Sequence, residues 1–338
     1  MVARLSVPPF VWVTTMMKSL AQRLATALLI GAFAATPALA QDYPARSVRI
    51  VVPYGPGTGV DLAARILAER LSKSLGQAFV VENRTGAAGS IAGAAVAAAT
   101  PDGYTLMMDA NGHTTVPALM KNLPYDPRRD FVGVAMFAES PLVLVTSRSV
   151  GYQSVQELVA AAKAKPGSIT FASAGVGTST HLAAEKFRIA AGFQALHVPY
   201  KSTTDALAEV MAGRIDYLVT TLPSALGPVK DGRLVVLAMG LRRSPLMPNV
   251  PTLAEAGVPN AESAAWFGLF APARTPRDVV TRLHAEVAKA LATPEARERL
   301  SNIGADPRPM GVDEFDALLK REFVDNENLV KAAGIKTD

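Results

Sequence analysis

The sequence of 338 residues contains 34 Lys and Arg against 29 Asp and Glu, a formal net charge of +5, and no cysteine. Without cysteine the chain cannot form disulfides, Cys-ligated zinc sites, iron–sulfur clusters, a catalytic thiol or an N-terminal lipid anchor on Cys. Its apolar content of 49% is typical of a globular protein. A chain of this length buries a full core and is expected to form one to three domains.

Residues 1–40 have the pattern of a secretory signal peptide. They lack Asp and Glu, basic Lys18 and Arg23 precede an apolar run at 24–35, and Ala38-Leu39-Ala40 matches the A-x-A cleavage motif. The apolar run is too short to cross a hydrocarbon core of ~30 Å, which argues against a membrane anchor. We therefore expect cleavage after Ala40 and a periplasmic protein free of any lipid anchor.

Cleavage changes what the net charge implies. Removal of Arg4, Lys18 and Arg23 leaves 31 basic and 29 acidic residues, a net charge of +2. The remaining chain has no basic run with interleaved aromatic residues, so the sequence predicts no nucleic-acid partner.

From residue 48 onward, short apolar strands alternate with helical patterns. In the first half we predict strands over 48–53, 79–82 and 104–108, and helices over 60–75 and 87–99. The pattern then restarts, with strands over 142–146, 169–172, 196–199, 217–221, 235–240 and 266–272 and helices over 155–164, 181–191, 203–212, 276–291 and 313–333. Strand–helix–strand order at this spacing predicts mainly parallel sheets, and the repeated order predicts two similar α/β lobes.

Each half contains a glycine-rich loop between a predicted strand and the following helix, at 54–59 and at 173–180. In parallel sheets, ligands bind beyond the carboxyl ends of the strands. A helix start there offers unpaired N–H groups and a partial positive charge. Thr58, Thr178 and Ser179 add hydroxyl groups. Two such loops facing each other would hold a small carboxylate from both sides without an arginine.

The sequence lacks the motifs of several other kinds of binding or catalytic site. Neither loop continues into the Lys-Ser/Thr of a P-loop, and Gly55-Pro56-Gly57 lacks the third glycine of a dinucleotide-binding loop. There is no G-x-S-x-G or H-E-x-x-H motif, and the four histidines do not have metal-ligand spacing. These motifs therefore give no indication of a P-loop, a dinucleotide-binding loop, a nucleophile elbow or a metal site.

Purely structural roles and a hydrolase activity stay open as alternatives. A single glycine loop can be a tight structural turn. Asp61 can complement the helix start, or contact an amine or hydroxyl of a ligand. A hydrolase that uses Ser173 or His181 is a weaker alternative. The sequence shows no pattern that would place a nucleophile beside a base and a third group that orients the base.

Ten segments in order carry a family pattern. They include PYGPGTGVDLAAR (53–65), VVENRTGAAGS (80–90), TPDGYTL (100–106), LPYDPRRDF (123–131), FASAGVGTSTHLAAE (171–185), HVPYKS (197–202), LPSAL (222–226) and WFGLFAPARTP (266–276). Over about 44–336 the chain resembles the substrate-binding receptors of the tripartite tricarboxylate transporter family, the Bug-type periplasmic receptors.

The resemblance implies a two-lobed periplasmic-binding-protein fold of the Venus flytrap type. Residues 41–143 and 267–338 would form lobe 1, including the C-terminal helices, and residues 144–266 would form lobe 2. The chain would cross between the lobes near 141–147 and 263–270. The implied function is delivery of a small carboxylic acid to the membrane subunits of a tripartite transporter, by a monomer without enzymatic activity or cofactor. A receptor that senses its ligand for a signalling partner is the alternative.

The resemblance also carries over a set of ligand-binding residues. In lobe 1 they are Tyr54, Gly55, Gly57, Thr58, Gly59, Asp61, Ser90, Asn111 and His113; in lobe 2 they are Ser173, Gly175, Gly177, Thr178, His181, Tyr200, Thr220 and Thr221. His181 could instead brace its loop. The first loop differs from the usual Phe-Pro-Ala-Gly-Gly, and Thr220-Thr221 replaces a common Asp-Asn pair. The absence of the usual Asp at position 220 disfavours a cationic amino acid as the ligand. The resemblance does not imply which carboxylate binds.

Overall fold

The computed structural model describes residues 43–120, 122–332 and 334–335, so the predicted signal segment 1–40 and its cleavage site lie outside the described residues. Within the described part, no helix combines the length and apolarity that crossing a bilayer requires.

The first half of the chain alternates strands and helices as predicted. Its elements are β1 (Val48–Val52), α2 (Gly59–Leu75), β2 (Phe79–Asn83), a short 3-10 turn (Ala87–Gly89), α3 (Ser90–Ala97), β3 (Thr105–Asp109) and α4 (Gly112–Leu119). The long strand β4 (Phe131–Ser147) follows.

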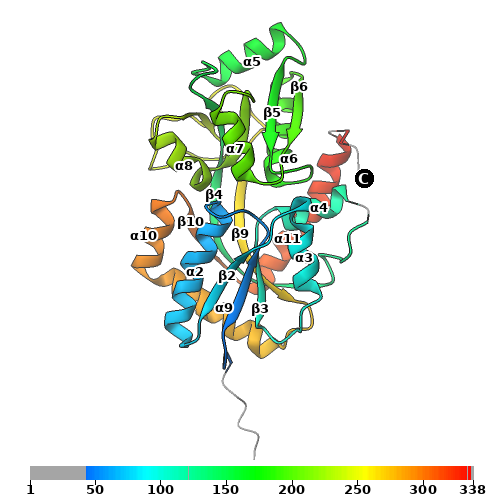
Figure 1. The fold of residues 1–338 in the computed structure, drawn as a ribbon, viewed down its shortest axis with the longest axis vertical. Helices are drawn as coiled ribbons and strands as arrows, with labels where there is room; N and C mark the ends of the chain where they lie inside the picture. The colour runs from blue at the N-terminus through cyan, green and yellow to red at the C-terminus, as the bar shows by residue number, and fades with distance from the viewer. Residues whose placement is uncertain (1–42, 121, 333, 336–338) are drawn as a thin grey trace, which may run out of the picture. The chain divides into compact units, whose positions relative to one another are not determined.

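The second half repeats this order. Its elements are α5 (Val155–Ala164), β5 (Ile169–Ser173), α6 (Ser179–Ala191), β6 (Ala195–Pro199), α7 (Thr203–Met211), β7 (Tyr217–Thr221), α8 (Leu222–Lys230) and β8 (Leu234–Met239). The chain ends with β9 (Ala264–Pro272), α9 (Arg277–Ala292), α10 (Pro294–Asn302), β10 (Asp306–Met310) and α11 (Val312–Ala332). The strand–loop–helix order from β1 to α4 therefore recurs from β5 to α8, as two similar lobes require (Figure 1).

Strand β4 belongs to both lobes. Its first part, up to Pro141, pairs with β9 and β10, whereas its second part, from Leu142, pairs with β7 and β8. The described strands thus follow the order β2-β1-β3-β9-β4-β7-β5-β6, with β8 and β10 also on β4. The change of partners falls within the predicted crossing at 141–147. The lobe boundaries at 143/144 and 266/267 stay predictions.

The outer strands are parallel and the linking strands are antiparallel. β1 pairs in parallel with β2 and β3, and β5 pairs in parallel with β6 and β7. β4 and β9 run antiparallel to each other, because the chain leaves the first lobe along β4 and returns to it along β9. The α/β fold with parallel sheets predicted from the strand–helix alternation is therefore confirmed.

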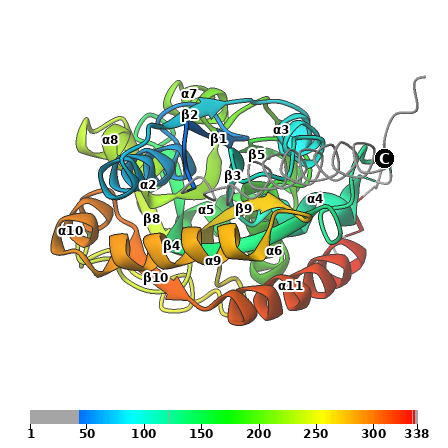
Figure 2. The same cartoon turned by 90° about the horizontal axis from the view of Figure 1, so that it is seen from below.

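The C-terminal helices pack on the first lobe. Phe315, Leu319 and Phe323 of α11 join a core cluster with Val51 of β1 and Phe270 of β9. The second lobe has its own cluster, built from β4, β5, β7, α7 and α8. In Figure 2, α9, β10 and α11 lie along one side of the molecule.

The sequence patterns missed or misplaced some elements. α4 contains Pro117, and α8 has a proline in its first turn and Pro228 further on, so both segments resemble loops in sequence. The continuous helix predicted over 87–99 is wrong. Ala88 has φ of +54°, which breaks the helical path and separates the 3-10 turn from α3.

Glycine is required where the chain crosses back between the lobes. The backbone N–H of Gly240 donates to the carbonyl of Leu142 at 2.5 Å. A Cβ at this position would lie 2.3 Å from the carbonyl oxygen of Ser263 and 2.9 Å from that of Leu142. Both neighbours are backbone atoms, which cannot move aside as a flexible side chain can.

We predict that Gly240→Ala lowers the free energy of unfolding by about 2–3 kcal/mol, the usual cost of forcing extra volume into a packed site. Gly227→Ala is the matched control, because its Cβ would meet nothing within 4 Å on the exposed face of α8. This control should be neutral or stabilising by less than about 1 kcal/mol. Urea denaturation of both variants checks the prediction, and equal stabilities would contradict it.

Candidate functional site

The loop between β1 and α2 is held in shape by its own threonine. Thr58 is the N-cap of α2; its Oγ1 accepts from the N–H of Asp61 and donates to the carbonyl of Gly55 at 2.9 Å. Gly57 has φ of +78°, a conformation that glycine adopts without strain. The loop thus turns sharply and presents the first N–H groups of α2 beyond the end of β1.

The loop between β5 and α6 has the same construction 120 residues later in the sequence. Thr178 is the N-cap of α6; its Oγ1 accepts from the N–H of His181 and donates to the carbonyl of Gly175 at 2.8 Å. Gly177, with φ of +89°, takes the place of Gly57. The shared G-x-G-T pattern therefore folds into the same turn in both lobes.

The first loop is braced by a carboxylate. Asp61 is 1% exposed, and its oxygens accept from the N–H of Gly57 at 2.9 Å, from Arg65 Nε at 3.0 Å and from Asn83 Nδ2 at 2.9 Å. Burial alone would raise the pKa of Asp61, but the hydrogen bonds from Arg65, Asn83 and Gly57 outweigh burial and lower it. The geometry gives Asp61 a bracing role.

The second loop is braced by a neutral ring at the equivalent position. His181 Nδ1 accepts from the N–H of Gly177 at 3.2 Å, and its ring stacks on that of His197 at 4.0 Å. Burial lowers the pKa of His181 to about 4 and that of His197 to about 3, so both rings are neutral at pH 7. His181 therefore has the geometry of a loop brace, the alternative left open by the sequence.

Ser173 is part of the same brace. It is 0% exposed, its Oγ lies 2.6 Å from His197 Nε2 and 3.1 Å from the carbonyl of Gly175, and it accepts from the N–H of Gly175. A nucleophile must reach its substrate. The burial of this hydroxyl therefore argues against the hydrolase alternative.

A small cavity of about 20 Å³ lies between the two loops and the start of α8. Its lining residues are Tyr54, Thr58, Gly59, Val60, Ala110, Ala174, Thr178, Ser179, Thr180, Thr203, Thr220, Thr221 and Ser224. The lobes touch here: the N–H of Gly59 donates to Ser224 Oγ at 3.0 Å, and Ser224 Oγ lies 2.8 Å from Thr221 Oγ1.

Several donors that line this cavity have no hydrogen-bond partner in the described part of the chain. Within the described ranges, no acceptor is bonded to the backbone N–H groups of Val60, Ser179 or Thr180 at the starts of α2 and α6. Thr220 Oγ1 is buried without a hydrogen-bond partner. Unsatisfied donors beside two helix starts form a site suited to an anion.

The structure brings some of the predicted residues together and separates others. Tyr54, Thr58, Gly59, Thr178, Thr220 and Thr221 line the cavity, whereas Gly55, Gly57, Gly175 and Gly177 shape the loops behind it. Thr180, Thr203 and Ser224 also line the cavity, although they are not among the residues predicted from the sequence. Thr180 and Ser224 lie in the family motifs at 171–185 and 222–226, so these motifs could have identified them as candidates.

Four predicted residues lie elsewhere. Ser90 begins α3, and the backbone N–H of Tyr200 donates to the carbonyl of Ser173 at 3.0 Å; neither residue lines the cavity. Asn111 lines a neighbouring pocket of about 190 Å³ between the lobes, which shares Ser179 with the cavity. His113 lies outside both, with its ring stacked on Phe270 at 4.1 Å. The geometry does not support its predicted contact with a ligand in the cavity.

Tyr54 is anchored behind the cavity by a buried carboxyl. Its hydroxyl forms a hydrogen bond with Asp109, the last residue of β3, and Asp109 Oδ1 also accepts from the N–H of Ala110 at 2.7 Å. Burial raises the pKa of Asp109 to about 7, and burial together with Asp109 raises that of Tyr54. These contacts fix the tyrosine of the first loop against β3.

The lowered pKa values of His181 and His197 predict acid sensitivity of the second lobe. The folded protein binds fewer protons at these rings than the unfolded chain, in which histidine titrates near pH 6.5. Their contribution to stability is complete above pH 6.5 and is lost as the pH falls toward 4, by at most about 1.4 kcal/mol per pH unit for each ring.

His197→Gln should therefore lose less stability than the unmodified chain between pH 7.5 and pH 5. Urea denaturation at the two pH values measures the difference, and comparison with the unmodified chain removes the contribution of other groups such as Asp109. Equal losses in both proteins would show that His197 does not titrate as predicted.

Known proteins resemble this chain over most of its length. Residues 63–335 match the family described as "Tripartite tricarboxylate transporter family receptor". Protein BugT of Bordetella pertussis is 34% identical over 316 residues, which is 91% of this chain and 97% of BugT. The structure of R. palustris Rpa4515 with adipate has a TM-score of 0.85 and 34% identity, covering 88% of this chain and 100% of that chain.

The structure of MatC from Rhodopseudomonas palustris with bound malate has a TM-score of 0.80 and 32% identity, covering 85% of this chain and 100% of that chain. These similarities confirm the predicted two-lobed periplasmic-binding-protein fold and the resemblance on which it rested. The chain belongs to the receptor family of the tripartite tricarboxylate transporters.

Proposed function

We propose that this protein is a periplasmic receptor that captures a small dicarboxylate between its lobes and delivers it to the membrane subunits of a tripartite transporter. In this proposal the signal segment is removed after Ala40, and the protein acts as a monomer without enzymatic activity. The observation that carries the proposal is the convergence of unpaired N–H groups and hydroxyls from both lobes on one cavity.

The chemistry of the lining favours a carboxylate. Among the residues that the structure describes, no Lys, Arg, Asp or Glu lines the cavity. Favourable interactions with an anion come instead from the helix starts and from hydroxyls, which can donate to carboxylate oxygens. Val60 offers its N–H from the first lobe, and Ser179 and Thr180 offer theirs from the second. Donors on opposite sides suit a molecule with a carboxylate at each end, as adipate and malate have.

The lobes must separate for a ligand to enter. A cavity of about 20 Å³ has room for roughly one water molecule. A dicarboxylate is several times larger, so binding requires the lobes to open and to close again around the ligand. Strand β4 and the segment between β8 and β9 join the lobes and are the candidate hinge.

Gly59 permits the close approach of the lobes. A Cβ at this position would lie 2.8 Å from Thr221 Oγ1 and 3.0 Å from Phe267 Cζ. We therefore expect Gly59→Ala to favour the open form, with a larger radius of gyration in X-ray scattering with adipate and at least tenfold weaker adipate binding. Gly311→Ala, whose Cβ would meet nothing within 4 Å, is the control. Closure and affinity equal to those of the control would contradict this role.

The unpaired hydroxyl of Thr220 provides the sharpest test of the site. We expect Thr220→Val to weaken adipate or malate binding about tenfold, the loss of one hydrogen bond to a charged group of roughly 1.5 kcal/mol. Its stability should not fall, because an unsatisfied buried polar group is removed. Thr275→Val is the matched control, since Thr275 Oγ1 is also buried and unpaired but lies outside the cavity.

Calorimetric titration with mono-, di- and tricarboxylates measures both variants. If the unmodified protein binds none of these acids, the proposed function is wrong. If it binds them but both valine variants retain full affinity, the function stands and the assignment of Thr220 fails.

A further inference from the structure

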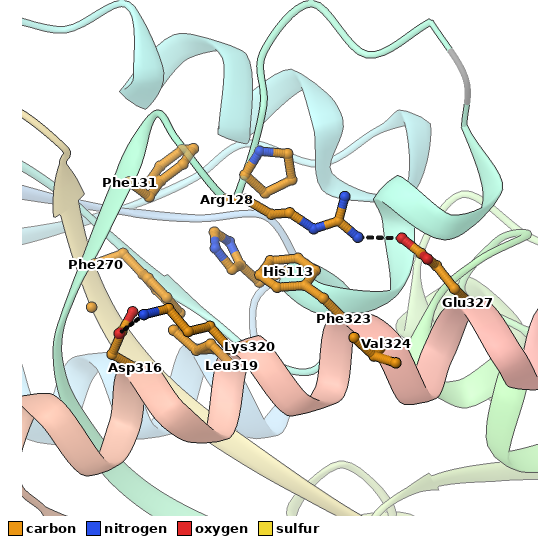
Figure 3. Close-up of a pocket in the computed structure, with 12 residues that line it drawn as sticks. His113, Arg128, Phe131, Phe270, Asp316, Leu319, Lys320, Phe323, Val324 and Glu327 are labelled. Carbon is orange, nitrogen blue, oxygen red and sulfur yellow. Dashed lines mark hydrogen bonds and ion pairs between the residues drawn. The ribbon is translucent and has the colours of Figure 1, made fainter.

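A larger pocket, of about 490 Å³, lies on the first lobe outside the small cavity between the two loops. Its walls come from α4, from β9, from α11 and from the segment that leads into β4 (Figure 3). Its described lining residues are all different from those of the small cavity between the two loops, called the interlobe cavity from here on. Its volume falls in the usual range for small-molecule sites, about 300–1,000 Å³.

The floor of this pocket is aromatic and carries no net charge. The His113 ring stacks on Phe270 with centroids 4.1 Å apart and meets Phe131 edge-on at 5.2 Å, and Phe323 lies 6.1 Å from it. Leu319 of α11 adds an aliphatic wall. His113 is buried and hydrogen-bonded to the carbonyl of Pro127, and its Nδ1 lies 3.8 Å from Asp109.

The charges at the rim are already paired with one another. Arg128 binds Glu327 and lies over the Phe323 ring at 4.7 Å, and Lys320 Nζ lies 2.6 Å from Asp316 Oδ2 (Figure 3). Two positive and two negative groups cancel, so an ion entering the pocket would have to displace an existing partner. Such a rim favours an uncharged ligand.

We propose that this pocket is a second small-molecule site, separate from the carboxylate site, that binds a compact uncharged aromatic molecule of one or two rings. Aromatic rings favour edge-to-face and offset contacts with other rings. The floor presents His113, Phe131 and Phe323, with the fully buried Phe270 packed against His113. The proposal does not depend on which acid the interlobe cavity takes.

Phenol is a suitable probe for the full chain, observed by saturation-transfer NMR and titration. We expect saturable binding with a dissociation constant on the order of 1 mM, as a ligand of this size allows. Cyclohexanol, which has no aromatic π system, and benzoate, which is charged, should both bind more weakly than phenol. Saturating adipate should not displace phenol.

Val324→Trp closes the mouth of the pocket. Val324 is 57% exposed at the rim, so the larger ring changes the opening without entering the core. We expect at least tenfold weaker phenol binding. Val80→Trp is the matched control, because Val80 of β2 is 54% exposed and lies outside this pocket, and it should bind phenol normally. Lys320→Trp, also at the exposed rim, serves if Val324→Trp does not fold.

Three results would overturn the proposal. They are the absence of saturable phenol binding, equal binding by the rim variant and the Val80→Trp control, and displacement of phenol by adipate, which would place it in the interlobe cavity. None of these results would count against carboxylate binding between the lobes.

Discussion

The first N–H groups of an α-helix have no acceptor within the helix, and the candidate site depends on this constraint. Thr58 and Thr178 satisfy one N–H each, at Asp61 and His181. Val60, Ser179 and Thr180 keep theirs available to the cavity. The same caps turn the chain so that both helix starts lie beyond the ends of β1 and β5. The proposed anion site therefore relies on backbone geometry, with no basic side chain among the described residues that line it.

The two loops have one backbone geometry but differ in chemistry. Asp61 braces the first loop as a carboxylate paired with Arg65, whereas His181 braces the second as a neutral ring stacked on His197. The first turn of α6 carries no acidic residue. The start of α6 is therefore free of the negative charge found beside α2, and it is the stronger position for an anion.

Contact between the lobes relies on small and apolar residues. Gly59 of the first lobe lies against Thr221 of the second, and Gly177 of the second lobe lies against Leu119 of the first. Leu119 of α4, Leu182 of α6 and Val330 of α11 form a small apolar cluster that joins both lobes. Burial of this cluster stabilises the observed arrangement of the lobes. A ligand bound between the lobes would stabilise this arrangement further only if it binds this arrangement more tightly than one in which the lobes are apart.

The sequence alone determined the alternation of strands and helices, the two loops with their threonine caps, and the family motifs, because these depend on local spacing and turn chemistry. It missed α4 and α8, whose prolines resemble loop signals. It also grouped His113 with the ligand site, although the side chain lies among Phe131, Phe270 and Phe323. Only the tertiary structure decided which donors meet. Ser224 reaches Gly59 because β4 joins the two lobes, and no local sequence pattern predicts a contact between residues 165 positions apart.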